Sequence, residues 1–304
     1  MTTIFIDSLL DDAGRRKRLY GGDIFIFSPR SSTLALCEFA RQMIEEAFGE
    51  DPQHAQYRMP VEEFVAIFAP LKPKFIHHPE TKTLIQKVLL DIGCDLRETY
   101  FDVPRLRGVT SHGYLTSGVG YAFPPHRDTW FSAPMCQVNW WLPIYDIEAE
   151  SSMDFHPQYY NTPIENDSHA FNYFEYNATG RKNAAQHINS DTRKQPRALH
   201  LVDREPAFRF VGRPGSIIFF SGAHLHSTVP NTSGRTRYSI DFRTVNYTDV
   251  KTQVGAPNID SHSPTSALRD FMGGMDFARI PDELIKPYEQ EGASRSGERV
   301  FRPD

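Results

Sequence analysis

The segment Arg213-Pro214-Gly215-Ser216-Ile217-Ile218-Phe219-Phe220 predicts a turn that leads into a buried strand. Proline and glycine set the backbone angles of a turn, and a short apolar run after it is typical of a strand covered on both faces. The chain then passes through Ala223-His224-Leu225-His226 to a second turn, Pro230-Asn231-Thr232-Ser233-Gly234, and a new strand is expected to begin at Arg237. A hairpin of this length would bring Arg237 back beside His226.

Other short strands are expected on both sides of this hairpin. The candidates lie at residues 24–27, 107–110, 120–123, 135–142, 207–211, 216–220 and 237–245. Several short strands joined by irregular loops are typical of a sandwich, a jelly roll or a cupin-like barrel. Polar and aromatic residues from 150 to 206 interrupt the strands, and a long ordered insertion of this kind often serves as a functional lid.

The residues before this strand-rich region favour helices. Apolar residues recur with a helical period over 31–48 and 81–92, each followed by a glycine, and a further helix is expected over 61–68. We therefore expect a mostly β fold with flanking helices. It would form one domain over 1–304, divided into an N-terminal strand and helical layer over 1–96, a core over 97–248 with the insertion 150–206, and a C-terminal extension over 249–304.

The composition is that of an ordinary soluble protein. Its 33 basic and 38 acidic residues give a formal charge of −5 without long runs of either sign, which disfavours binding to nucleic acid or to an anionic membrane. The amino terminus lacks the pattern of a signal peptide, and no apolar run reaches the roughly 18 residues of a membrane span. Three widely spaced cysteines suit a reducing compartment. We expect a cytoplasmic protein, and its oligomeric state stays open.

Two short motifs carry residues that commonly bind metal ions. In Pro125-His126-Arg127-Asp128, the histidine and the aspartate are two positions apart, so on a β-strand both side chains project from one face. His226, from a distant strand, would complete a set of two imidazoles and one carboxylate. This facial set holds non-haem iron(II) and leaves coordination positions open. We therefore predict a metal centre formed by His126, Asp128 and His226.

Arg237 is the expected anchor for a dicarboxylate beside the metal, because its planar guanidinium pairs with both oxygens of a carboxylate. His224 and Arg235 repeat the spacing of His226 and Arg237 two residues earlier, and on a regular strand His224 would share a face with His226. His226 and Arg237 are preferred because Arg235 falls in the turn, whereas Arg237 begins a strand. A slip of register would reverse the choice.

The run His226-Ser227-Thr228-Val229-Pro230-Asn231-Thr232-Ser233, with Arg237 after it, resembles the phytanoyl-CoA hydroxylase-like family of 2-oxoglutarate dioxygenases. So does Trp141-Leu142-Pro143-Ile144-Tyr145-Asp146, which in that family is the strand after the His-x-Asp motif. The resemblance covers about residues 110 to 245. It implies a double-stranded β-helix, which is a distorted jelly roll, with Fe(II) bound by the two histidines and the aspartate.

The resemblance also assigns roles by position. Arg237 would pair with the distal carboxylate of 2-oxoglutarate, and Thr228 would join that contact. Trp141 would form an aromatic wall of the co-substrate pocket, and Asn139, on the same strand face, is a weaker candidate. The implied reaction uses Fe(II), 2-oxoglutarate and O2; it hydroxylates or otherwise oxidises a substrate while 2-oxoglutarate becomes succinate. Because Asp128 fills a position that halogenating relatives leave empty for chloride, hydroxylation, desaturation or ring formation is favoured over chlorination.

The substrate side departs from the family pattern. Where the family usually has Pro-Gly-Ser-His, this chain has Met153-Asp154-Phe155-His156, and the insertion after it is longer than the family's core requires. Polar and aromatic residues that could face a cavity suit a small polar substrate with several hydroxyl, amine or carboxylate groups. They are Tyr114, Thr116, Tyr121, Arg127, Trp130 and Gln137 near the motif, and Asn161, Asn172, Asn177, Arg181 and Lys182 in the insertion.

Two other functions stay open from the sequence. A cupin-type metal enzyme that uses no 2-oxo acid would have no need of Arg237, and succinate formation would distinguish it. A catalytically silent jelly-roll binding module would take up neither iron nor manganese, although the complete set of metal-binding residues disfavours it.

Overall fold

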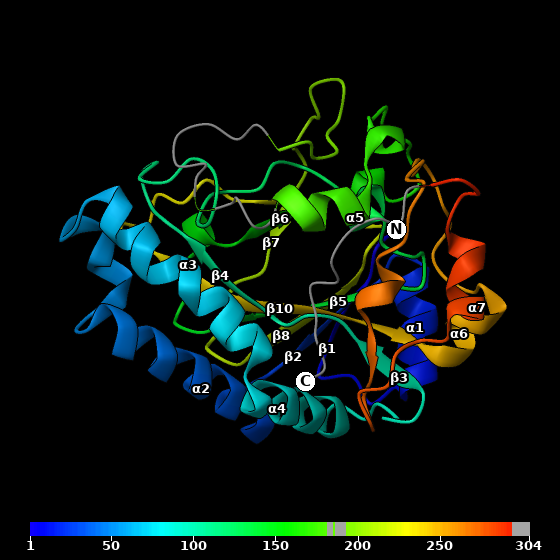
Figure 1. Ribbon diagram of the computed structural model, residues 1–304, viewed down its shortest axis with the longest axis horizontal. Coiled ribbons are helices and arrows are strands. Elements are labelled where there is room, and N and C mark those ends of the chain that lie inside the picture. The colour runs from blue at the N-terminus through cyan, green and yellow to red at the C-terminus, as the bar shows by residue number, and fades with distance from the viewer. Residues whose placement is uncertain (181–184, 186–192, 294–304) are drawn as a thin grey trace.

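A mixed β-sheet of eight strands forms the centre of the protein in a computed structural model that describes residues 1–180, 185 and 193–293 (Figure 1). Its order is β1-β2-β8-β5-β10-β3-β11, and β4 also pairs with β10. The strands are β1 (Ile4–Ile6), β2 (Ile24–Phe27), β3 (Thr99–Phe101), β4 (Arg105–Val109), β5 (Val138–Pro143), β8 (Ile217–Ser221), β10 (Arg237–Asn246) and β11 (Met272–Gly273). β10 has β5 on one side and both β3 and β4 on the other, so it joins the two halves of the sheet.

A second, smaller sheet lies beside the first. It contains β6 (Met153–Phe155) between β7 (Phe208–Arg209) and β9 (His226–Thr228). Phe155 pairs with His226. The region 150–206 therefore begins with a strand of this sheet before it continues into short helical turns such as α5 (Tyr173–Glu175). Its role as a lid stays a prediction.

The two faces of β10 have opposite character. Tyr238, Ile240 and Phe242 alternate along one face and are fully buried in the main hydrophobic core. Arg237 and Asp241 lie on the other face, because successive side chains of a strand point to opposite sides. Strand alternation thus places an apolar row against the core and a charged row on the side where the candidate site lies.

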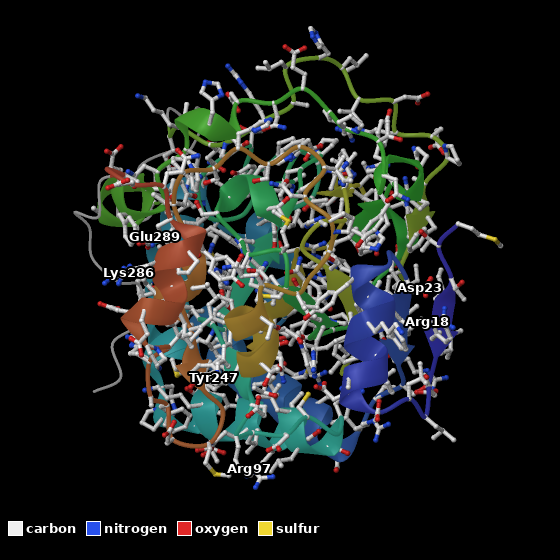
Figure 2. All side chains as sticks on the ribbon, turned by 90° about the vertical axis from the view of Figure 1, so that its right-hand side faces the viewer. Arg18, Asp23, Arg97, Tyr247, Lys286 and Glu289 are labelled. Carbon is white, nitrogen blue, oxygen red and sulfur yellow. The ribbon has the colours of Figure 1, made fainter. Side chains whose placement is uncertain are left out.

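Helices cover the sheet on two sides. α2 (Ser31–Phe48), α3 (Val61–His77) and α4 (Pro79–Asp91) lie along one side (Figure 1). Rings of α3 such as Phe68 pack against Tyr238 of β10. On another side, α1 (Asp12–Tyr20), α6 (Tyr247–Thr252) and α7 (Asp282–Ile285) lie next to one another (Figure 2). An ion pair between Arg16 and Asp249 (2.7 Å) ties α1 to α6. None of the helices within the described ranges is long and apolar enough to span a membrane.

Several sequence predictions are confirmed and others need correction. The helices expected over 31–48 and 81–92 are present as α2 and α4. The helix expected to end at residue 68 continues to His77 through Pro70 and Pro73, because burial of its apolar face outweighs the loss of two N–H donors. The strand expected at 120–123 does not form; this stretch is a loop. Helix accounts for 36% and strand for 18% of the described residues, so the chain is richer in helix than "mostly β" implies.

Candidate active site

His126 and His226 are brought together by their own backbones. Each donates its N–H to the other's carbonyl, at 2.9 and 3.0 Å, and the two form an isolated β-bridge at the edge of the smaller sheet. Their rings lie with centroids 4.3 Å apart. Residues a hundred positions apart in the sequence are thus fixed side by side by main-chain hydrogen bonds, which do not depend on the side chains themselves.

Backbone carbonyls also orient both imidazoles. Nδ1 of His126 lies 2.8 Å from the carbonyl oxygen of Pro124, and Nδ1 of His226 lies 3.0 Å from that of His224. A carbonyl only accepts hydrogen bonds, so each Nδ1 carries a proton, and in the neutral ring Nε2 then keeps its lone pair. This is the usual arrangement of a histidine that binds a metal through Nε2.

Asp128 completes the cluster from the first residue of a short 3-10 helix, Asp128–Phe131, rather than from a strand as predicted. Its Oδ1 lies 3.5 Å from Nε2 of His126 and 4.0 Å from Nε2 of His226. The ligand atoms of the three residues all lie within 4.8 Å of one another. Two lone pairs and a carboxylate oxygen converge, and such a group of acceptors needs a cation or a proton between them. The donor set therefore fits a metal ion.

The protonation states suit metal binding. Burial alone would raise the pKa of Asp128, but contact with His126 and the charges of His226 and Arg105 lower it to about 2. Burial, together with the neighbouring His126, lowers the pKa of His226 to about 4. At neutral pH the carboxylate is ionised and His226 is neutral, which are the forms that bind a metal.

The second carboxylate oxygen of Asp128 contacts two other polar side chains. Its Oδ2 accepts a hydrogen bond from Nε2 of Gln137 (3.1 Å) and lies 3.5 Å from Nε of Arg243. Gln137 donates in turn to Oδ1 of Asn139 (2.9 Å). These contacts leave Oδ1 of Asp128 directed at the two histidines.

The cluster opens into a cavity of about 960 Å³. All the predicted site residues line this cavity: His126, Asp128, His226, Arg237, Thr228, Trp141 and Asn139. Phe123 and Phe131 pack against the His126 ring, with centroids 4.8 and 5.4 Å away. The metal-binding atoms therefore lie in a space that is partly apolar and large enough for a small molecule.

Arg237 is a buried cation that lacks a carboxylate partner among the described residues. It is only 5% exposed, and its Nη1 donates to the carbonyls of Ser151 (3.1 Å) and Ser152 (3.2 Å). Its Nε has no acceptor within the described ranges, and the guanidinium lies 5.3 Å from the centre of the Trp141 ring. Burial, with repulsion from Arg107, lowers the pKa of Arg237 to about 10. Such a group gains strongly from a bound anion.

The competing histidine does not join the cluster. The chain turns at 222–225 before β9 begins at His226, so the strand alternation assumed for His224 does not apply. The His224 ring is fully buried against Tyr160, 4.6 Å away between centroids. Arg235 lies at the surface near Glu148 (3.9 Å).

Some residues expected near the substrate lie elsewhere. Arg127 is buried and pairs with Asp260 (3.0 Å), which also accepts from Nε1 of Trp130 (2.7 Å). Of the other candidates, Tyr121, Gln137 and Asn177 line the cavity, and Arg181 and Lys182 lie outside the described residues. The sequence prediction missed Arg243, although strand alternation from Arg237 would have found it, and it missed Lys72, for which the sequence carries no signal.

Comparison with known proteins identifies the family. The sequence model of phytanoyl-CoA dioxygenase matches residues 35–239, which include the histidine–aspartate cluster and Arg237. The chain belongs to the phytanoyl-CoA dioxygenase family. It is accordingly a non-haem iron oxygenase that depends on 2-oxoglutarate, and its histidine–aspartate cluster suits Fe(II).

Solved structures show distant likenesses to this member of the phytanoyl-CoA dioxygenase family. EvdO2 from Micromonospora carbonacea var. aurantiaca, complexed with 2-oxoglutarate, is 12% identical with a TM-score of 0.44, over 79% of this chain and 92% of that one. AviO1 from Streptomyces viridochromogenes Tue57 is 13% identical with a TM-score of 0.40, over 83% and 99%. The epimerase SnoN, in complex with Fe3+, alpha ketoglutarate and nogalamycin RO, is 15% identical with a TM-score of 0.39, over 77% and 84%. No curated protein matches the sequence.

Proposed function

We propose that this oxygenase hydroxylates a small polar molecule, with His126, Asp128 and His226 as its iron ligands and Arg237 as the anchor of 2-oxoglutarate. The observation that carries the proposal is the position of Arg237. A buried guanidinium without a carboxylate partner among the described residues opens into the same cavity as the three metal-binding side chains. A dicarboxylate could bind a metal at the three side chains through one end and pair with the guanidinium of Arg237 through the other.

The residues around Arg237 fit this role. Trp141 places its ring beneath the guanidinium and gives the co-substrate a flat apolar wall. Thr228, at the end of β9, lines the cavity and is the proposed hydroxyl partner of the distal carboxylate. Asn139 is held by Gln137, so we assign it to the support of Asp128 as well as to the cavity wall.

When bound, iron and 2-oxoglutarate supply the oxidising power, with O2 as oxidant and succinate and carbon dioxide as products. The chain's own residues set the conditions for this chemistry. The carbonyls of Pro124 and His224 hold the proton of each neutral ring on Nδ1, which leaves the Nε2 lone pair for the metal, and Gln137 and Arg243 hold Asp128 in place. Phe123 and Phe131 exclude water from the side of His126 that they cover.

The carboxylate of Asp128 supports hydroxylation over halogenation, because it fills the position that a halide would need. The larger sheet and the smaller sheet beside it, to whose edge strand His126 is bridged, support a double-stranded β-helix core within residues 97–248. Arg237, which has no carboxylate partner in the described part of the chain, disfavours a cupin-type enzyme that works without a 2-oxo acid.

An anaerobic titration tests the proposal. Protein loaded with iron(II) is titrated with 2-oxoglutarate under nitrogen while the metal-to-ligand charge-transfer absorption is recorded. We expect the band to appear in the wild type and to be lost in His226→Ala. A wild-type protein that binds iron but shows no band would exclude chelation of 2-oxoglutarate at this metal and with it the proposed function.

A further inference from the structure

The cavity beside the metal cluster carries an excess of positive charge. Six cationic side chains line it among the described residues: Lys72, Arg105, Arg107, Arg193, Arg237 and Arg243. Only three carboxylates do so, namely Asp102, Asp128 and Asp241. The formal excess is three positive charges. Ferrous iron and the 2-oxoglutarate dianion have equal and opposite charges, so loading the centre leaves this excess unchanged.

Two of the cavity arginines, Arg105 and Arg243, are neutralised by an aspartate between them. Asp102 accepts from Nη1 of Arg105 (2.8 Å) and Nη1 of Arg243 (3.2 Å). Arg243 also approaches Asp128, and the side chains of Arg105 and Arg243 are only 12% and 17% exposed. These two arginines therefore belong to the wall that supports the metal ligands.

Arg107 is different because only some of its N–H donors have an acceptor among the described residues. Its Nε and Nη2 contact Asp241 at 2.6 and 3.4 Å, but within the described residues its Nη1 has no acceptor. The Arg107 side chain is 39% exposed although it lines the cavity. One edge of its guanidinium is thus available to a ligand.

Lys72 reaches the same part of the cavity from helix α3. Phe68 packs directly on Gly108 of β4, where an added Cβ would lie 2.8 Å from the Phe68 ring. Lys72 follows Phe68 by one helical turn on the same face, and its Nζ lies 5.0 Å from the centre of that ring. The close approach of α3 to β4 therefore carries the lysine to the neighbourhood of Arg107.

Lys72 has no carboxylate partner in the described part of the chain, since its ammonium donates only to the carbonyl of Val119. Burial, with repulsion from Arg107 and Arg193, lowers the pKa of Lys72 to about 7. Lys72 and Arg107 both line the cavity and repel each other, and Asp241, which pairs with Arg107, only partly offsets the charge on Lys72. An anion between them would relieve this repulsion.

We propose that the substrate carries an anionic group, a carboxylate or a phosphate, that binds between Lys72 and Arg107. The rest of the substrate would lie against the aromatic residues of the cavity, such as Tyr121 and Phe123, toward the metal ligands. This inference rests on the proposed function and deepens it by naming the substrate class and the residues that select it. Charge-assisted hydrogen bonds from an ammonium and a guanidinium recognise both kinds of anion.

Calorimetry on the iron- and 2-oxoglutarate-loaded protein under nitrogen tests this inference. The probes are 3-phenylpropionate, its neutral amide and phenyl phosphate. We expect at least one of the two anions to bind about tenfold or more tightly than the amide. Lys72→Met and Arg107→Gln should each weaken the binding of that anion by about 10-fold to 100-fold. Comparison of the two anions identifies the preferred group. Lys74→Met, an exposed lysine on the same helix, is the matched control and should change nothing.

Three outcomes would overturn the anion site: equal binding of amide and anions, no binding of either anion, or unchanged affinity in both variants. Weakened binding of 2-oxoglutarate in Lys72→Met and Arg107→Gln, with anion binding intact, would assign these cations to the co-substrate instead. The charge-transfer band of the loaded wild type, recorded first, shows separately whether the proposed function holds.

Discussion

Replacing Arg237 with methionine should weaken 2-oxoglutarate binding strongly while leaving the stability of the cofactor-free protein nearly unchanged. The loss of binding follows from the loss of a buried charge-assisted pair, which is worth about 2–5 kcal/mol. At about 1.4 kcal/mol for each factor of ten, the dissociation constant for 2-oxoglutarate should rise at least roughly 30-fold.

The effect on stability is a balance of two opposing contributions. The pKa of Arg237 is lowered to about 10 in the folded protein, so at neutral pH, where the group is charged in both states, its charge costs the folded state about 3 kcal/mol. Methionine removes this cost. It also leaves the carbonyls of Ser151 and Ser152 without the Nη1 donor, at about 1–3 kcal/mol for a buried group left unpaired. We therefore expect a net change in the free energy of unfolding within about 2 kcal/mol.

Two measurements on the same samples separate these effects. Denaturant unfolding of the iron-free protein gives the stability, and the anaerobic charge-transfer titration gives the affinity for 2-oxoglutarate. Arg235→Met is the matched control, since that arginine lies at the surface and should affect neither quantity. The reasoning is refuted if Arg237→Met keeps its affinity for 2-oxoglutarate, or if Arg235→Met loses it.

Three further changes probe the metal centre and the cavity. His226→Ala should lose iron while His224→Ala keeps it, as measured by metal analysis after gel filtration; the opposite pattern would show that the distal ligand is misassigned. Gln137→Leu removes the 3.1 Å donor behind Asp128 and should lower iron affinity by about 10-fold to 100-fold in competition with a chromophoric chelator, and an unchanged affinity would count against this supporting role. Gly108→Ala should push α3 away from β4 and lower the free energy of unfolding by about 1–3 kcal/mol in urea, whereas a neutral effect would mean that the two elements do not pack as closely as described.

The part of the site that depends on local sequence could be predicted. Turn residues around a short apolar run predicted β8, and the hairpin after it predicted the strand β10 that begins at Arg237. The prediction failed where alternation did not apply. His224 lies in a turn, and Arg127 precedes a 3-10 helix, so neither side chain points where a regular strand would place it.

Contacts between distant elements could not be predicted in the same way. Lys72 belongs to a helix whose apolar period predicts burial of Phe68 but says nothing about which strand that ring will meet. Only the packing on Gly108 brings the lysine to the cavity. The extension of α3 past two prolines escaped prediction for a related reason, because tertiary burial overrode a local helix-breaking signal.

The ten residues of β10 have to satisfy two demands at once, since odd positions such as Arg237 and Asp241 line the cavity and even positions such as Ile240 and Phe242 fill the core. Inserting or deleting one amino acid inside this strand would turn the residues beyond that point to the opposite face. Charged side chains would then enter the hydrophobic core, and aromatic rings would face the cavity. Evolution can therefore lengthen or shorten the loops around this strand, but it can alter the strand itself only by substitution.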